Sequence, residues 1–145
     1  IGISSPVSAQ INSEDLPMLD DAFPISQSGI FVYRMQMAIN GKNIANLMSQ
    51  RDEETNLPYQ AEHAYKQKAE KGVKITDIVK DETPLVIYYD HMDPDNAQDR
   101  FSYMTRVNMP VEMYELTLAE SVFDYNVNVF KTAGTMYSKA VDLMK

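Results

Sequence analysis

The sequence lacks cysteine and tryptophan, and it has only two histidines and five glycines. Without cysteine, the chain can form neither a disulfide scaffold nor a cysteine-ligated zinc or iron–sulfur site. Two histidines are too few for a multi-histidine metal centre. No apolar run approaches the roughly 18 residues that a membrane-spanning helix requires, and the longest run covers residues 85–89. A catalytic site usually needs glycine-containing turns around it, whereas long helices need little glycine. The scarcity of glycine therefore fits long helices better.

Acidic residues outnumber basic ones by 21 to 13, which gives a formal net charge of −8 over 145 residues. A nucleic-acid-binding protein needs a basic patch, and nothing in the composition suggests one. The length fits one domain. Residues 1–24 are acidic, contain three prolines and show no period, so we expect an extended N-terminal arm there.

Residues 25–48 are predicted to form a helix, because apolar residues recur there at alternating intervals of three and four. The pair Asn40-Gly41 is by itself a turn signal, but the flanking residues follow the helical period. This period predicts a heptad seam in which Asn40 fills one position. The other seam residues include Ile30, Tyr33, Met37 and Ile44.

The C-terminal segment gives the strongest periodic signal. Asn108 is a favourable N-cap and Pro110 lies in the first turn, where proline is tolerated. One amphipathic helix is predicted over residues 112–143, roughly 48 Å long. Its seam includes Leu116, Phe123, Phe130 and Tyr137. A second apolar stripe would face water in a monomer, and this exposure indicates contact with other chains. Its residues include Val122, Tyr125, Val129 and Met136.

The middle of the chain is predicted to be a small β module. Residues 61–71 fit either a short helix or an irregular segment, whereas residues 73–79, 85–89 and 101–104 resemble strands of one antiparallel sheet. The predicted fold is therefore mainly α, with the two terminal helices paired as a coiled-coil-like hairpin and an antiparallel β insert between them. We expect an arm over residues 1–24, a helical core over 25–49 plus 107–145, and an outer module over 50–106.

No constellation of residues indicates catalysis, a metal or a cofactor. Nucleotide-binding, hydrolase and phosphate-loop motifs are absent. The stretch over residues 93–104 begins like a calcium loop, but Gln98 and Met104 occupy its glycine and last-ligand positions. Glu112 and Glu115 are interpreted as favourable charges at a helix N-terminus rather than as a catalytic pair. The sequence therefore predicts a non-enzymatic protein without cofactor or metal.

Several segments resemble the bacterial flagellar axial proteins, in which an S-G-L segment leads without gaps into N-N-I-A-N. The matching motif residues are Ser28, Gly29, Asn43, Ile44, Ala45 and Asn46. Further segments resemble the proximal rod proteins of the FlgC type. They are Pro58-Tyr59, residues 72–75, residues 93–95 and the segment from residue 107 onward. Lys42 departs from the family pattern by replacing the first asparagine, and residues 1–22 have no counterpart.

The resemblance implies a structural subunit of the flagellar proximal rod, which carries torque and encloses an export channel. It implies export by the flagellar type III system, a periplasmic position in the basal body, and contact with copies of itself, other rod proteins and ring components. It implies no enzymatic activity, no membrane span and no nucleic-acid partner. Two alternatives stay open: another axial or type III secretion inner-rod component, or a soluble helical adaptor that forms a closed dimer.

Overall fold

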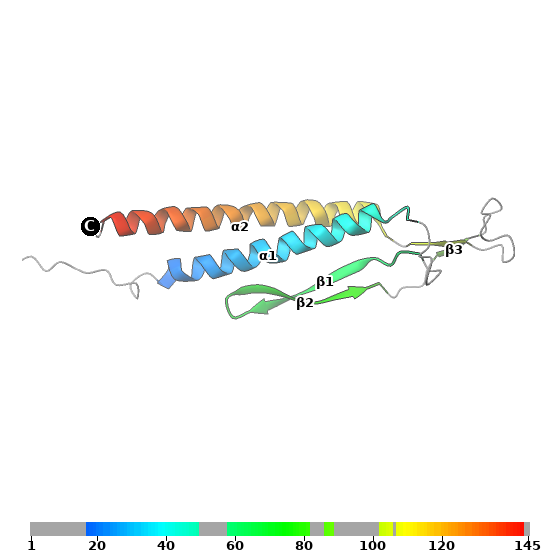
Figure 1. Ribbon diagram of the computed structural model, residues 1–145, viewed down its shortest axis with the longest axis horizontal. Helices are drawn as coiled ribbons and strands as arrows, with labels where there is room; N and C mark the ends of the chain where they lie inside the picture. The colour runs from blue at the N-terminus through cyan, green and yellow to red at the C-terminus, as the bar shows by residue number, and fades with distance from the viewer. Residues whose placement is uncertain (1–16, 50–57, 82–85, 89–101, 106, 144–145) are drawn as a thin grey trace, which may run out of the picture.

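Figure 1 shows the computed structural model of the protein, an elongated molecule built along two antiparallel helices. The structure describes residues 17–49, 58–81, 86–88, 102–105 and 107–143. The predicted arm over residues 1–16 and the stretch over 89–101, with most of the calcium-like segment, lie outside these ranges. The elements are α1 (Pro17–Ala45), β1 (Glu62–Ala69), β2 (Gly72–Lys80), β3 (Val86–Tyr88), β4 (Ser102–Met104) and α2 (Met109–Leu143).

Helix α2 confirms the predicted C-terminal helix and extends it to Met109. The side chain of Asn108 accepts a hydrogen bond from the backbone N–H of Val111 (3.4 Å), and its carbonyl accepts one from Glu112 (3.0 Å). These contacts satisfy two of the N–H groups that a helix start leaves without partners. At 1.5 Å per residue, the helix is about 52 Å long.

Helix α1 begins at Pro17, so the prediction of an extended arm is wrong for residues 17–24. Pro24 lies inside the helix, where a proline removes one backbone hydrogen bond. Packing explains why the helix continues through it. The ring of Phe23 meets Phe130 edge-on at 5.3 Å and lies 6.4 Å from Tyr137. These contacts, which the sequence period did not reveal, stabilise the first turns of α1 against α2.

Strands β1 and β2 form an antiparallel hairpin with its turn at Glu70 and Lys71. Gly72 follows the turn with a φ of 99°, a conformation that side chains rarely allow. A register shift after Tyr65 marks a bulge. The prediction of a helix or irregular segment over residues 61–71 is therefore wrong, because the polar sequence of β1 hides a strand whose side chains are largely exposed.

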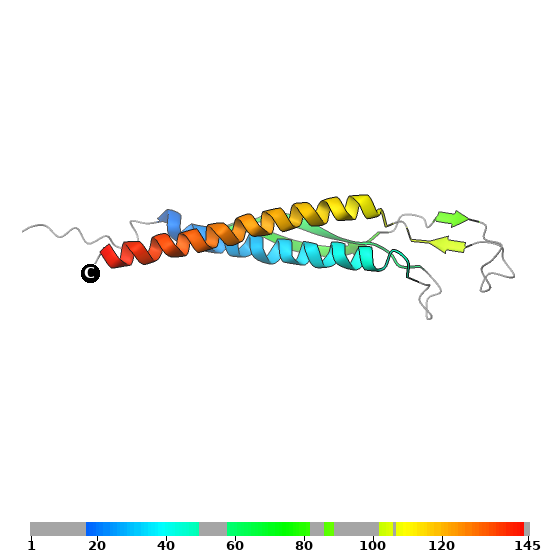
Figure 2. The same cartoon turned by 90° about the horizontal axis from the view of Figure 1, so that it is seen from above.

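Strands β3 and β4 form a second, separate antiparallel pair. This arrangement corrects the prediction of one three-stranded sheet, although all three predicted strands exist in the described residues. The β3–β4 pair lies beyond the end of α1 and the start of α2, while β1 and β2 run alongside the helices (Figure 2).

The main body has three layers, with α1 between α2 on one side and the β1–β2 hairpin on the other (Figure 1). Its core is narrow and consists of small or medium-sized apolar side chains. The buried apolar residues are Val32, Ile39, Ala61, Val107, Ala119 and Ala133. The helices approach closely at Gly29, where an added Cβ would lie 2.4 Å from the side-chain oxygen of Asn126. In the described part of the chain, neither helix combines the length and apolarity needed to cross a membrane.

Candidate functional site

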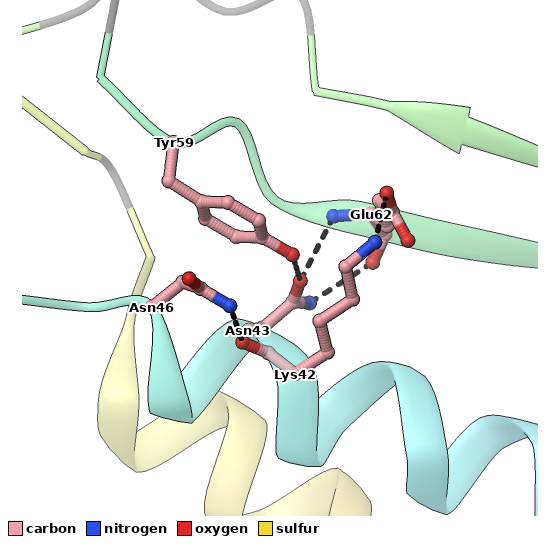
Figure 3. Close-up of polar contacts among 5 residues, drawn as sticks. All are labelled: Lys42, Asn43, Asn46, Tyr59 and Glu62. Atoms are coloured by element: carbon pink, nitrogen blue, oxygen red, sulfur yellow. Dashed lines mark hydrogen bonds and ion pairs between the residues drawn. The ribbon is translucent and has the colours of Figure 1, made fainter. Parts of the chain in front are cut away.

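The amide of Asn43 connects three segments of the chain near the end of α1, and Figure 3 shows its contacts with Tyr59 and Glu62. Its Oδ1 accepts hydrogen bonds from the Tyr59 hydroxyl and from the backbone N–H of Glu62, both at 2.9 Å. Its Nδ2 donates to the backbone carbonyl of Glu62 (2.9 Å) and to Oε2 of Glu112 (3.1 Å). All four hydrogen-bonding positions of the amide are used, and the residue is 1% exposed. Asn43 therefore joins α1 to the start of β1 and to the start of α2.

Glu112 places a carboxylate in the interface between the two helices, with only 4% of the residue exposed. Its Oε2 accepts hydrogen bonds from Nδ2 of Asn40 (3.0 Å) and of Asn43. Asn40 also donates to Glu115 (3.1 Å) and accepts from Gln36 (2.6 Å). Because a buried carboxylate is costly unless it is hydrogen-bonded, sliding α1 by one turn would leave Glu112 without these donors. The network therefore fixes the register of the helices.

Lys42 extends from the same turn of α1 to the hairpin. Its Nζ donates to Oε1 of Glu62 at 2.6 Å, with the lysine side chain half exposed and the glutamate side chain largely covered. This hydrogen bond is the main reason why the pKa of Lys42 lies above its usual value. Burial raises the pKa of the neighbouring Tyr59. Both groups are thus held in their protonated forms in the folded protein.

A second set of contacts attaches the other end of the hairpin to α1. The Ser28 hydroxyl accepts a hydrogen bond from the backbone N–H of Val73 (3.1 Å). A Cβ added at Gly72 would lie 1.9 Å from the same oxygen, so only glycine fits there. Lys71 pairs with Asp21 at 2.7 Å. The hairpin is therefore held at its base by Asn43 and at its tip by Ser28.

Within the residues that the structure describes, no three His, Asp or Glu side chains are grouped to hold a metal ion. The polar groups of the Asn43 contacts bond to one another rather than converging on a cavity. This arrangement stabilises the relative positions of α1, α2 and the hairpin, which is a structural role.

The predicted seam residues lie partly in the helix interface. Six of them are half-buried, namely Ile30, Tyr33, Met37, Ile44, Leu116 and Phe123. Phe130 is 39% exposed and Tyr137 is 50% exposed, although both reach Phe23. The fully buried line of α1 shares Asn40 with the predicted seam, otherwise lies about one residue away from it, and is mostly small or polar. Its residues are Ser26, Gly29, Val32, Gln36, Ile39, Asn40 and Asn43.

Most of the second stripe faces solvent along α2. Tyr125 is 71% exposed, Val129 and Met136 are about half exposed, and Val122 is half-buried. Further large apolar side chains extend the exposed surface along the helix: Val111, Tyr114, Leu118 and Leu143. A surface of this kind is typical of a site that other chains cover.

The motif residues divide by role. Ser28 and Asn43 hold the hairpin, and Gly29 lets the helices approach. Ile44 is half-buried and Ala45 is exposed. Asn46 bonds within its own chain segment, donating to the Lys42 carbonyl at 2.8 Å (Figure 3).

The sequence reasoning missed the buried roles of Gln36 and Glu112, and it missed the hydrogen bonds that the partly buried Tyr59 and Glu62 make to Asn43. It assigned Glu112 to the helix N-terminus, where it does lie in the first turn. The signal that could have revealed the network is a polar residue inside an apolar line on each helix, Asn40 on one and Glu112 on the other. Two such residues in paired helices indicate a buried hydrogen-bonded contact that sets register.

Comparison with known proteins gives two similar chains. The flagellar basal-body rod protein FlgC of Bacillus subtilis (strain 168) is 23% identical over 142 residues, which cover 83% of this chain and 95% of that protein. The protein of the same name from Borreliella burgdorferi is 28% identical over 79 residues, about half (52%) of each chain. No protein-family model matches the chain. The similarity is thus to flagellar rod proteins, which are structural proteins by name rather than enzymes.

Proposed function

We propose that this chain is a structural subunit of the bacterial flagellar rod, and specifically a proximal rod protein of the FlgC type. The observation that carries the proposal is the similarity to the Bacillus subtilis rod protein over 95% of that protein's length. The long helical pair and the exposed apolar side chains of α2 suit a subunit whose surface other chains cover.

In this proposal, the helical pair assembles with copies of itself and with other rod proteins, near the basal-body rings. The assembly forms the drive shaft and export channel between motor and hook in the periplasm, and the subunit reaches it through the flagellar type III system. The absence of cysteine suits a chain that crosses into an oxidising compartment, where stray disulfides would form. The subunit carries out no catalysis and needs no cofactor.

Two sets of side chains would perform the work. Within the subunit, the helices pair through Ile30, Tyr33, Met37, Ile44, Leu116, Phe123, Phe130 and Tyr137. Between subunits, the stripe of Val122, Tyr125, Val129 and Met136 is covered by neighbouring chains. The exposed part of this stripe offers contact area that a monomer leaves in water.

The test is the location of the chain in purified basal bodies of the organism that encodes it. We expect a tagged copy to be recovered in the rod fraction, and deletion of the gene to stop swimming at the rod stage. The double substitution Tyr125→Asp/Val129→Asp should also block motility while the protein still folds. Thr135→Asp, on the exposed polar side of α2, serves as the matched control and should swim normally.

The proposal is wrong if the deletion strain swims normally and the chain is recovered as a compact soluble dimer. That result would favour the alternative of a helical adaptor. Recovery in a secretion-system inner rod, or in a different section of the flagellar axis, would keep the structural role but replace the proximal rod assignment.

A further inference from the structure

Each helix has one line of exposed residues along its length. On α2, the outer stripe consists of large apolar side chains that are 47% to 88% exposed. Its residues are Val111, Tyr114, Leu118, Tyr125, Val129, Met136 and Leu143. On α1, the outer line runs along the side of the helix opposite its fully buried line. Its residues are Asp20, Gln27, Phe31, Arg34, Ala38, Lys42 and Ala45.

The outer stripe of α2 has the area and length of an interface. Its side chains leave on the order of 100 Å² each in water, so together roughly 700 Å², close to the about 800 Å² that one partner contributes to a standard interface. The stripe is roughly 48 Å long. Helix α1, with 29 residues, is about 43 Å long, whereas the nine residues of β2 reach only about 30 Å. Among the described elements, only a helix of a second copy can cover the stripe.

The outer line of α1 repeats the spacing of the outer stripe in the opposite direction. Exposed residues of α1 follow one another at positions 20, 27, 31, 38, 42 and 45, and those of α2 at positions 136, 129, 125, 118, 114 and 111. Within the chain, Asn43 contacts Glu112 and Gly29 contacts Asn126, so these pairs are level along the axis. A copy that is displaced sideways, without a shift along the axis, therefore brings each of these α1 positions level with its α2 counterpart to within one residue.

The side chains that become level in this way fit one another. Leu118 meets the short side chain of Ala38, which lets the two helices approach closely. Tyr125, which is 71% exposed, meets Phe31, which is 55% exposed. Pairs of aromatic rings are favourable beyond the area that they bury. The outer line of α1 thus offers a small side chain and an aromatic partner where the outer stripe needs them.

Building on the proposed rod function, we propose that the outer stripe of α2 in one copy packs along the outer line of α1 in the next copy. The two copies have the same orientation, so the helices in contact are antiparallel, as they are within the subunit. The contact joins two different surfaces, so it can repeat from copy to copy. Packing α2 against α2 would instead close a symmetric pair and leave Phe31 in water.

The first test uses the absence of native cysteine. Ala38→Cys places a thiol on the outer line and Leu118→Cys places one on the outer stripe, both at exposed positions. Under mild oxidation, a mixture of the two variants should give a covalent dimer, and neither variant alone should do so. Ser138→Cys, exposed on another side of α2, is the matched control and should give no dimer with Ala38→Cys. A dimer from Leu118→Cys alone, or none from the mixture, would overturn the proposed contact.

The second test places charge on the outer line of α1. Phe31→Asp/Ala38→Asp should leave the circular dichroism spectrum of the chain unchanged, because both residues are exposed. Sedimentation should show association at least about tenfold weaker than that of the unchanged protein, since the contact would bury unpaired carboxylates. Thr135→Asp/Ser138→Asp adds the same charge to α2 away from the outer stripe and should leave association unchanged.

The outcomes separate this inference from the rod function itself. Association that ignores Phe31→Asp/Ala38→Asp, or a chain that stays monomeric at every concentration, overturns the contact between α2 and α1 of the next copy. The rod function is judged independently by recovery of the chain in purified basal bodies, which does not depend on how neighbouring copies touch.

Discussion

Replacement of Asn43 by alanine should destabilise the protein more than any other single change of a polar side chain on α1. The substitution removes four hydrogen bonds and leaves both backbone groups of Glu62 without their partner. It also removes one donor from the buried Glu112 and the acceptor of the Tyr59 hydroxyl. Each bond contributes about 1 kcal/mol net, and Tyr59 can turn to water because it is only half-buried, so the expected loss is about 3 kcal/mol.

Such a loss is a large fraction of the roughly 5–15 kcal/mol that stabilises a typical folded domain. For a chain of this size it corresponds to a fall in melting temperature of roughly 6 to 12 °C. Thermal and urea unfolding followed by circular dichroism measure both quantities. Limited proteolysis should show earlier cleavage in the β1–β2 hairpin, since Asn43 holds its base.

Asn46→Ala is the matched control, because this asparagine belongs to the same motif. Among the described residues, its side chain bonds to the Lys42 carbonyl, four residues back in the chain, and to Ser49, at exposed positions. Loss of such bonds should cost less than about 1 kcal/mol. The reasoning is refuted if Asn43→Ala unfolds at the same temperature as the unchanged protein, or if the two alanine substitutions cost the same.

Three further predictions concern packing and pH. Gly29→Ala should lower the free energy of unfolding by roughly 1 to 3 kcal/mol because the added methyl meets α2. Gly134 has open space around it, so Gly134→Ala should raise the free energy of unfolding by about 0.5 to 1 kcal/mol. Equal effects of the two substitutions in urea unfolding would contradict the packing at Gly29. The pKa values of Lys42 and Tyr59 are raised in the folded protein. The stability that these two groups add to the fold is therefore complete below their usual pKa values of 10.5 and 10.0, and it is lost as pH rises through their folded-state pKa values. Urea unfolding between pH 8 and 11 should therefore show a decline at the alkaline end, and Tyr59→Phe should make that decline shallower; an unchanged slope would contradict the assignment. Phe123→Asp should disrupt the helical pair and stop motility at the rod stage, and normal swimming would refute the predicted seam.

The helical part of the fold was predictable to the extent that one face of each helix is buried. Among the described elements, helix α2 packs mainly on α1, and its apolar period gave its length nearly to the residue. Helix α1 is covered from two sides, so its apolar line lies half-buried beside a fully buried line of small and polar residues. A period of apolar residues cannot reveal a face whose contacts are hydrogen bonds, as at Gln36, Asn40 and Asn43.

The strands show a different limit. β2 was predicted because it contains alternating branched residues, but β1 was not, because lysine and glutamine fill its exposed positions. Its place in the structure depends on distant contacts, such as the cation–π contact in which Lys66 lies 5.3 Å from the ring centre of Tyr33. The start of α1 likewise depends on the distant ring of Phe130. Local sequence carries no trace of such partners, and for this reason the predicted boundaries at residues 25 and 61–71 were wrong.

The two attachment points of the hairpin have a mechanical consequence. Ser28 and Asn43 lie about 22 Å apart along α1, at 1.5 Å per residue. A force that slides the hairpin along the helix loads both points at once, so they resist shear together. A force that lifts one end of the hairpin breaks one point before it reaches the other. The hairpin should therefore stay attached to α1 far longer under a pull along the long axis of the subunit than under a peeling force across it.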